Sequence, residues 1–262
     1  MRLADGYDAL LFDLDGVLYR GDQAIVGAAE TLAALRSDGH RIAFVTNNSA
    51  RTPEEVAEIL GRHGFQASPA EVVTSALATA DLLAERGGGT AYVIGERGLR
   101  DALTAAGVHL LDDDPLAVDT VVVGWDRGVT YAKLRTASLL VQRGARLVAT
   151  NADRSFPAPD GLWPGAGALL AVITTTTEVE PEVVGKPNPP LLLSALRRTG
   201  GSRPLLIGDR LETDIAGALG LGWDCLLVLS GVTTADQASS AAIRPTYTAP
   251  DVSALLDDVA HP

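Results

Sequence analysis

Two aspartates that directly follow an apolar run are the residues of this sequence best placed for chemistry. Residues 9–19 read Ala-Leu-Leu-Phe-Asp-Leu-Asp-Gly-Val-Leu-Tyr, so Asp13 and Asp15 stand where the apolar run ends. Such a run predicts a buried parallel strand, and open α/β sheets bind ligands at the carboxyl ends of their strands. Two carboxylates there need a cation, and Mg²⁺ prefers oxygen ligands. The simpler alternative is that Asp13 caps the next segment and that Asp15 and Gly16 form an ordinary turn.

Polar residues follow two other predicted strands. The second strand runs into Thr46, Asn47 and Asn48, and a hydroxyl, an amide and the adjacent backbone N–H groups there can hold phosphoryl oxygens. A later strand ends just before Asp209, and with Asp214 this residue can supply oxygen ligands for Mg²⁺. A carboxylate can attack phosphorus, and a second carboxylate can transfer the proton. Together these segments are suited to phosphoryl transfer.

Lysine usage singles out one cation. The chain has 21 basic residues, and only Lys133 and Lys186 are lysines. Lys186 lies between Gly185 and Pro187, where a point charge suits a phosphate group or crowded carboxylates. Lys133 falls in a predicted helix among alanine and arginine, and we interpret it as a solvated side chain.

Length and composition limit the class of protein. The 262 residues suffice for one large domain or two smaller ones, and an aromatic content of 5% suits an aliphatic α/β core. A net charge of −12 argues against nucleic-acid binding, which needs a basic face. No apolar run approaches the ~18 residues of a membrane span, and acidic residues near the start argue against a signal peptide. We therefore expect a cytoplasmic protein without membrane partners. One cysteine excludes an internal disulfide.

Strand–helix alternation along the chain predicts a doubly wound parallel sheet of the Rossmann-like α/β class, with a second α/β domain inserted into it. We assign residues 1–75 and 186–262 to the core and residues 76–185 to the insertion. Residues 151–164 are predicted to be a loop, and residues 232–247 a surface connection. Strands are expected at 9–12, 41–46, 71–74, 90–94, 108–111, 119–124, 145–150, 204–207 and 224–229. Helices are expected at 27–37, 52–62, 75–85, 99–106, 131–143, 165–175, 190–198, 212–219 and 251–259.

Four segments carry a resemblance to a known family. They are Asp-Leu-Asp-Gly-Val-Leu-Tyr from position 13, Thr-Asn-Asn-Ser from 46, Val-Gly-Lys-Pro from 184 and Gly-Asp-Arg-Leu-Glu-Thr-Asp from 208. Their order and spacing resemble the haloacid dehalogenase (HAD) superfamily of aspartate-nucleophile phosphatases, in the group with a large α/β (C2-type) cap. That group includes NagD-type, 4-nitrophenyl-, phosphoglycolate, glycerol-phosphate and pyridoxal-phosphate phosphatases. Segments 122–126, 149–151 and 164–167 resemble its cap.

The resemblance implies a role for each core residue. Asp13 would be the nucleophile and a Mg²⁺ ligand, and Asp15 the general acid and base, with its carbonyl as a second ligand. Thr46 and Asn47 would hold the phosphoryl group, and Lys186 would neutralise charge.

The resemblance also implies a magnesium site that Asp209 completes and Asp214 supports. Within the superfamily, the second acid separates chemistries: dehalogenase relatives lack a carboxylate at the position of Asp15, and ion-pumping ATPases carry threonine there. An aspartate at this position favours hydrolysis.

In relatives, the cap loop that matches residues 151–163 faces the phosphoryl site and sets substrate choice. Asn151, Arg154 and Phe156 are therefore candidate substrate-binding residues: Arg154 to pair a second anionic group, and Phe156 to pack against an apolar or sugar face. The alternative, which the sequence supports equally, is that Phe156 only anchors the loop and that Arg154 faces solvent. Asp126, after Gly-Trp, is a further candidate to face the pocket.

We expect a Mg²⁺-dependent phosphatase of small phosphorylated metabolites such as a sugar phosphate, glycerol phosphate, phosphoglycolate or nucleotide. Two alternatives stay open: a phospho-metabolite binding or sensing protein with little turnover, and a phosphotransferase. The intact acid pair speaks against a pure binder. Phosphomutases of the superfamily carry a small helical cap after the first motif, which differs from this chain. The sequence leaves the oligomeric state open; relatives often dimerise through the cap, so a homodimer is the alternative to a monomer.

Overall fold

The computed structural model describes residues 1–158 and 160–258. The chain divides into two compact units. The first, which we call the core, comprises residues 1–46, 54–73 and 186 onward, and the second, the cap, comprises residues 47–53 and 74–185. Segment 47–53 thus belongs to the cap, whereas the sequence analysis placed all of residues 1–75 in the core.

A six-stranded sheet forms the centre of the core, in the order β15-β14-β13-β1-β4-β5. Neighbouring strands from β15 to β4 pair in parallel, so the predicted doubly wound α/β fold is confirmed. The strands are β1 (Ala9–Phe12), β4 (Arg41–Thr46), β5 (Val72–Thr74), β13 (Pro204–Gly208), β14 (Asp224–Val228) and β15 (Tyr247–Ala249).

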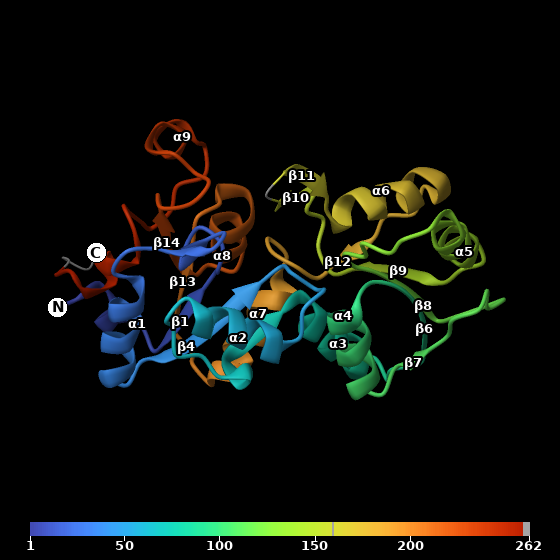
Figure 1. Cartoon of the computed structure of the whole chain (residues 1–262), viewed down its shortest axis with the longest axis horizontal. Helices are drawn as coiled ribbons and strands as arrows, with labels where there is room; N and C mark the ends of the chain where they lie inside the picture. Colours follow the sequence, from blue (N-terminus) through green and yellow to red (C-terminus); the bar gives the residue numbers. More distant parts are fainter. Residues whose placement is uncertain (159, 259–262) are drawn as a thin grey trace. The chain divides into compact units, whose positions relative to one another are not determined.

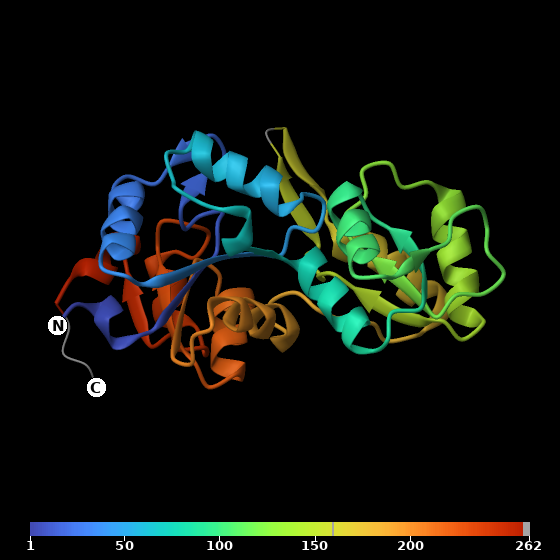
Figure 2. The ribbon, with the colours of Figure 1, turned by 90° about the horizontal axis from the view of Figure 1, so that it is seen from below.

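Both faces of the core sheet are buried, which explains why its strands read as continuous apolar runs. Leu10 and Phe12 of β1 lie in one apolar cluster with Leu32 and Leu60, which come from α1 (Ala28–Ser37) and α2 (Pro53–Arg62). Figure 2 shows these two helices on one face of the sheet, and α7 (Pro189–Thr199) and α8 (Ala216–Gly220) on the other.

The cap has a parallel sheet of its own, in the order β12-β9-β8-β6-β7. Helices α5 and α6 cover one face of this sheet and α3 and α4 the other (Figure 1). The elements are β6 (Thr90–Ile94), β7 (His109–Leu110), β8 (Thr120–Val123), β9 (Arg146–Ala149), β12 (Glu182–Val183), α3 (Ser75–Glu85), α4 (Arg97–Ala105), α5 (Tyr131–Gln142) and α6 (Ala166–Thr177).

A two-stranded hairpin replaces the loop expected at 151–164, and this part of the prediction was wrong. Strands β10 (Ser155–Ala158) and β11 (Gly161–Pro164) pair antiparallel, with Phe156 opposite Trp163. The prolines within the segment suggested a loop, but a hairpin of two edge strands tolerates proline because edge N–H groups need no ladder partner.

Short elements complete the fold, and they change two expectations at the end of the chain. Residues 232–247 contain helix α9 (Ala235–Ser240), and the helix expected at 251–259 is a 3₁₀ turn, Val252–Leu256; residue 259 lies outside the described residues. The other short elements are two 3₁₀ turns, Leu3–Gly6 and Pro69–Glu71, and strands β2 (Tyr19–Arg20) and β3 (Gln23–Ala24). No helix of the described ranges is long and apolar enough to cross a bilayer.

Hydrogen bonds explain why segment 47–53 belongs to the cap. The Ser75 hydroxyl donates to the Asn47 carbonyl (2.6 Å), and the Gly98 N–H donates to the Ala50 carbonyl (2.9 Å). A side chain at Gly98 would collide with this segment, because its Cβ would lie 2.5 Å from the Arg51 carbonyl. The start of α4 and segment 47–53 therefore pack backbone against backbone.

Candidate active site

Strand β1 delivers Asp13 to the carboxyl edge of the core sheet, as the sequence predicted. The Asp13 N–H donates to the Ile207 carbonyl of β13 at 2.9 Å, so the sheet ladder continues up to the nucleophile candidate. Gly16 then turns the chain with φ of +83°, and its N–H donates to the Tyr19 carbonyl (2.7 Å). A Cβ at Gly16 would lie 2.4 Å from Asp209 Oδ2, so only glycine lets this turn approach the carboxylate.

Lys186 is the buried cation that holds this site together. Its ammonium lies 2.6 Å from Asp13 Oδ1 and 2.7 Å from Asp214 Oδ1, and it donates to the Val45 carbonyl at 3.2 Å. Only 2% of its side chain is exposed. The desolvation of an ammonium is costly, and here two carboxylates offset it. Burial lowers the Lys186 pKa, but Asp13 and Asp214 together raise it by more than burial lowers it, so the net pKa is raised.

The loop that follows β14 positions Asp209, a role of this loop that was not predicted from the sequence. The Val232 N–H donates to Asp209 Oδ2 (2.7 Å), and the Thr233 N–H donates to the Asp209 carbonyl (3.2 Å). Ser230 ties the same loop to the first motif, because its hydroxyl donates to the Gly16 carbonyl (2.8 Å). The available signal was Ser-Gly directly after a buried strand.

Asp214 stands on a π-helical turn, residues 211–215, that leads into α8. Its Oδ2 accepts the Arg210 N–H (3.2 Å), and its Oδ1 pairs with Lys186. Gly208 makes room for it, since a Cβ there would lie 2.2 Å from Asp214 Cβ. Asp214 is thereby packed against the end of β13.

Three carboxylates form a group with the geometry of a cation site. Single oxygens of Asp13, Asp209 and Asp214 all lie within 4.8 Å of one another. Asp209 Oδ1 is buried and accepts no hydrogen bond from the part of the chain that the structure describes. A buried carboxylate oxygen left without a donor is costly, and oxygen-rich groups of this kind suit a hard divalent cation. The residues present therefore fit a bound Mg²⁺.

Burial and the nearby negative charges raise the pKa values of two of these groups. Burial raises the pKa of Asp13 to about 8, with the Asp214 and Asp209 charges adding to the rise and Lys186 opposing it. Burial likewise raises the pKa of Asp209 to about 6, and Asp214 adds to it. A divalent cation would oppose both shifts, because it favours the ionised carboxylates.

The other two core candidates lie at the same edge. Thr46 is the last residue of β4 and is buried, with 7% of its surface exposed. Asp15 is exposed and forms an isolated β-bridge with Tyr19, next to the Gly16 turn.

Asn47 and Asn151 meet within the cap. The Asn151 amide donates to the Asn47 carbonyl (2.7 Å), and the Asn151 Oδ1 accepts the Asp153 N–H (3.0 Å). The Asn47 amide in turn contacts the Asp153 carboxylate at 3.3 and 3.4 Å. Gly185 completes the group, because a Cβ there would lie 2.7 Å from Asn47 Oδ1. The Asn151 side chain thus supports the chain at Asn47.

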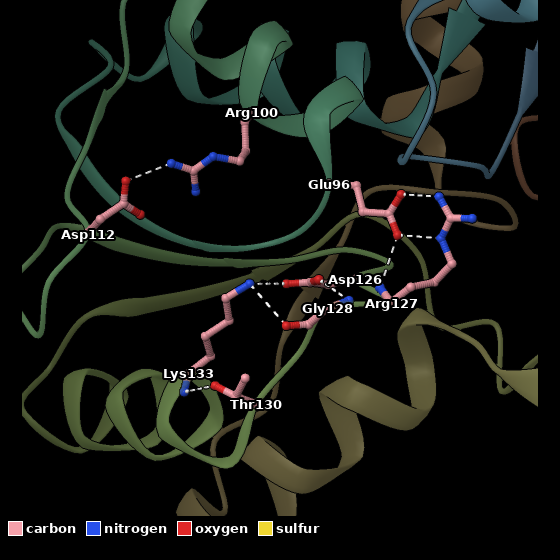
Figure 3. Close-up of polar contacts among 8 residues, drawn as sticks. All are labelled: Glu96, Arg100, Asp112, Asp126, Arg127, Gly128, Thr130 and Lys133. Carbon is pink, nitrogen blue, oxygen red and sulfur yellow. Dashed lines mark hydrogen bonds and ion pairs between the residues drawn. The ribbon is translucent and has the colours of Figure 1, made fainter.

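Asp126 and Lys133 form an ion pair (2.8 Å), in which the Asp126 side chain is 4% exposed and that of Lys133 41% (Figure 3). Our interpretation of Lys133 as merely solvated was therefore wrong. The other Asp126 oxygen accepts the Gly128 N–H (2.8 Å), so both oxygens hold the chain around them.

The remaining cap candidates lie at the start of the hairpin and in segment 47–53. Phe156 stacks on Trp125, with ring centroids 4.4 Å apart, and Arg154 is exposed. Asn48 Oδ1 accepts the Ala50 N–H (2.9 Å), which shapes its own turn.

The fold and this acidic site are those of a hydrolase, and comparisons with known proteins agree. Residues 10–109 match the model of haloacid dehalogenase-like hydrolases, and residues 183–255 match a HAD-hydrolase-like model. An acid sugar phosphatase from Staphylococcus saprophyticus is 42% identical over 256 residues, which cover 97% of this chain and 98% of that protein.

Two solved structures are similar over nearly the whole chain. The glycerol phosphate phosphatase of Mycobacterium tuberculosis in complex with magnesium superposes with a TM-score of 0.92 at 38% identity, covering 98% of this chain and 79% of that one. NagD from E. coli K-12 superposes with a TM-score of 0.88 at 34% identity, covering 94% and 97%. The chain belongs to the haloacid dehalogenase-like hydrolase family, and the expectation of a NagD-like phosphatase is confirmed.

Proposed function

We propose that this chain hydrolyses small phosphomonoesters with Mg²⁺, by way of a phosphorylated Asp13. The observation that carries the proposal is the charge balance of the core site. With all three carboxylates ionised, which is the state that a divalent cation favours, Asp13, Asp209 and Asp214 bring three formal negative charges. Lys186 brings one positive charge, which leaves −2. A phosphate dianion would be repelled by this group alone, whereas one divalent cation makes the site neutral.

The chemistry divides into two displacements on one aspartate. An Asp13 carboxylate oxygen attacks phosphorus, and the bond to the substrate oxygen breaks while Asp15 gives that oxygen a proton. Water then attacks the phosphorus atom while Asp15 accepts a proton from it. The bond between phosphorus and the Asp13 oxygen breaks, and inorganic phosphate leaves. Lys186 keeps the Asp13 carboxylate in place throughout, through the 2.6 Å contact with Oδ1.

The metal would be held by Asp13, Asp209 and the Asp15 carbonyl, with Asp214 supporting them. When bound, it supplies positive charge that offsets the charge of the phosphoryl group in the transition state. Thr46 would bind phosphoryl oxygens from the end of β4, together with Asn47.

Sugar phosphates and polyol phosphates are the substrate class that we propose. The names of two relatives, acid sugar phosphatase and glycerol phosphate phosphatase, support this choice. We assign contact with the organic part of the substrate to the cap hairpin, through Arg154 and Phe156. A cytoplasmic location and a homodimer formed through the cap complete the proposal; size-exclusion chromatography with light scattering tests the dimer.

The deciding experiment measures phosphate release from 4-nitrophenyl phosphate, glycerol phosphate and a panel of sugar phosphates. Wild type and Asp13→Asn are compared with Mg²⁺ and with a chelator. We expect Mg²⁺-dependent turnover in wild type and a loss of at least about a thousandfold in the variant, because the nucleophile is gone. Ligand binding without turnover on any compound would refute the enzyme and favour the phospho-metabolite sensor. Phosphate transferred to an alcohol acceptor instead of water would favour the phosphotransferase.

A further inference from the structure

A chain of contacts in the cap runs from Glu96 to the hairpin β10–β11. Glu96 is the residue before α4, and Arg127 lies in the segment between β8 and α5. Glu96 accepts three hydrogen bonds from Arg127: one from the backbone N–H (3.0 Å), one from Nε (2.7 Å) and one from Nη2 (2.7 Å). Figure 3 shows the two carboxylate oxygens of Glu96 opposite two guanidinium nitrogens of Arg127 in this bidentate pair. Both the main chain and the side chain of Arg127 are thereby fixed.

The Arg127 guanidinium, fixed in this way, contacts the ring of Trp125. Its central carbon lies 5.2 Å from the centroid of the Trp125 ring, in a cation–π arrangement. Phe156 is also stacked on Trp125, at 4.4 Å between centroids and 30° between planes. The indole therefore has two ring-face partners, a cation from its own loop and an aromatic ring from the hairpin.

Trp125 contacts both strands of the hairpin. It stacks on Phe156 of β10, and its indole Nε1–H donates to the Pro164 carbonyl of β11 at 2.9 Å. Phe156 faces Trp163 across the two strands, so these side chains share one face of the hairpin. An isolated two-stranded hairpin is at best marginally stable in water, and Trp125 supplies contacts to each of its strands from outside.

The loop that carries Trp125 is itself held from its other side. Asp126 Oδ2 pairs with Lys133 on α5 (2.8 Å), and Asp126 Oδ1 accepts the Gly128 N–H (2.8 Å). Trp125 also donates its backbone N–H to the Ser49 hydroxyl at 3.3 Å. The segment from Gly124 to Thr130 is consequently anchored to α5 as well as to Glu96, and it forms a firm support.

We propose that Glu96, Arg127 and Trp125 are positioning residues that set the place of the β10–β11 hairpin, and thereby its affinity for the organic part of the substrate. This inference rests on the proposed function only in assigning substrate contact to the hairpin. None of the three residues needs to touch substrate. Their effect passes through Phe156, whose ring is fixed by Trp125.

The test combines hydrogen exchange with steady-state kinetics on Arg127→Met, Glu96→Gln and Trp125→Ala. Arg100→Met is the matched control, because the Arg100–Asp112 pair has a similar distance (2.7 Å) and lies in the same unit (Figure 3). We expect backbone amides of β10 and β11 to exchange about tenfold faster in Trp125→Ala, which loses its contacts to both strands. In Arg127→Met and Glu96→Gln the factor should be about threefold, because the Arg127 side chain of this pair is 59% exposed. Exchange in Arg100→Met should match wild type.

The kinetic readout separates positioning from general damage. We expect KM for sugar and glycerol phosphates to rise about fivefold to tenfold in Trp125→Ala and about twofold to threefold in Arg127→Met and Glu96→Gln. The value of kcat should stay within about twofold, because only binding of the organic group is weakened. Inhibition by inorganic phosphate, which lacks that group, should not change. Trp125→Phe keeps an aromatic ring for the stack on Phe156 but loses the Nε1–H donor and part of the ring area, so its KM should lie between those of wild type and Trp125→Ala.

Two results would overturn the inference. Hairpin exchange that equals wild type in Trp125→Ala and Arg127→Met would show that these residues do not position β10–β11. Faster exchange with unchanged KM on every substrate would remove the link to substrate affinity. If wild type shows no phosphatase activity, the proposed function fails on its own, while the exchange arm still decides whether Trp125 positions the hairpin.

Discussion

Replacing Lys186 with methionine should destabilise the core strongly, because it removes the cation that is shared by two carboxylates. The ammonium lies 2.6 Å from Asp13 and 2.7 Å from Asp214, and the Asp214 side chain is only 1% exposed. Methionine keeps most of the volume of the side chain but leaves the acids facing one another. Removing one partner of a buried ion pair costs about 3–5 kcal/mol.

That loss is a large share of the roughly 5–15 kcal/mol of a typical domain. At about 2–4 °C per kcal/mol for a unit of this size, the midpoint of thermal unfolding should fall by roughly 10 °C. Circular dichroism would follow unfolding in the presence of a chelator, so that metal cannot replace the missing charge. Arg135→Met serves as the control, since the Arg135–Asp114 pair is exposed (50% and 64%) and should contribute below about 1 kcal/mol.

A double variant tests the cause of the loss. Adding Asp214→Asn to Lys186→Met removes one of the unpaired charges, and we expect it to restore part of the lost stability. A Lys186→Met protein whose unfolding midpoint stays within about 2 °C of wild type would refute the charge argument. So would a double variant that is less stable than Lys186→Met alone.

Three further predictions follow from contacts described above. Asp15→Asn should slow turnover by about a hundredfold to ten-thousandfold with little change in thermal stability, and intact-mass spectrometry checks whether the phosphorylated protein accumulates; unchanged turnover would contradict the acid–base role. Gly16→Ala should weaken Mg²⁺ binding measured by calorimetry, because its Cβ would lie 2.4 Å from a metal-site carboxylate oxygen, whereas Gly21→Ala, with nothing within 4 Å, should not. Burial raises the pKa of Glu71, but hydrogen bonds from Arg36 outweigh it and hold the net pKa below 4.5. The stabilisation is therefore present above pH 4.5 and is lost as the pH falls through the lower, folded pKa, so Glu71→Gln should differ from wild type in urea unfolding at pH 7 and converge with it in acid.

The core of the fold was predictable because its strands are buried on both faces. Each such strand appears as an unbroken apolar run, and the chemistry stands at the first polar residue after it, as at Asp13 and Asp209. Lys186 stood out by composition, in a chain with only two lysines. These are local signals, and the parallel sheet brings them together because its strand ends share one edge.

The supporting contacts were not predictable, because they join residues that are distant in sequence. Trp125 and Phe156 are separated by 30 intervening residues, and neither has a periodic pattern around it that indicates the other. The prediction for Lys133 was wrong for a related reason. The sequence of its helix indicated a solvated side chain, but the preceding loop folds back and places Asp126 beside its ammonium. The prolines of the hairpin suggested a loop where two edge strands form.

The division of the chain has a consequence for exchanging caps between relatives. The chain passes from one unit to the other four times, after residues 46, 53, 73 and 185. A chimera made by transplanting residues 74–185 alone would keep the host's segment 47–53, which in this chain is fitted backbone to backbone against the start of α4. The transferable module is therefore discontinuous. Grafts that carry segment 47–53 along with residues 74–185 should express as folded protein more often than grafts that omit it.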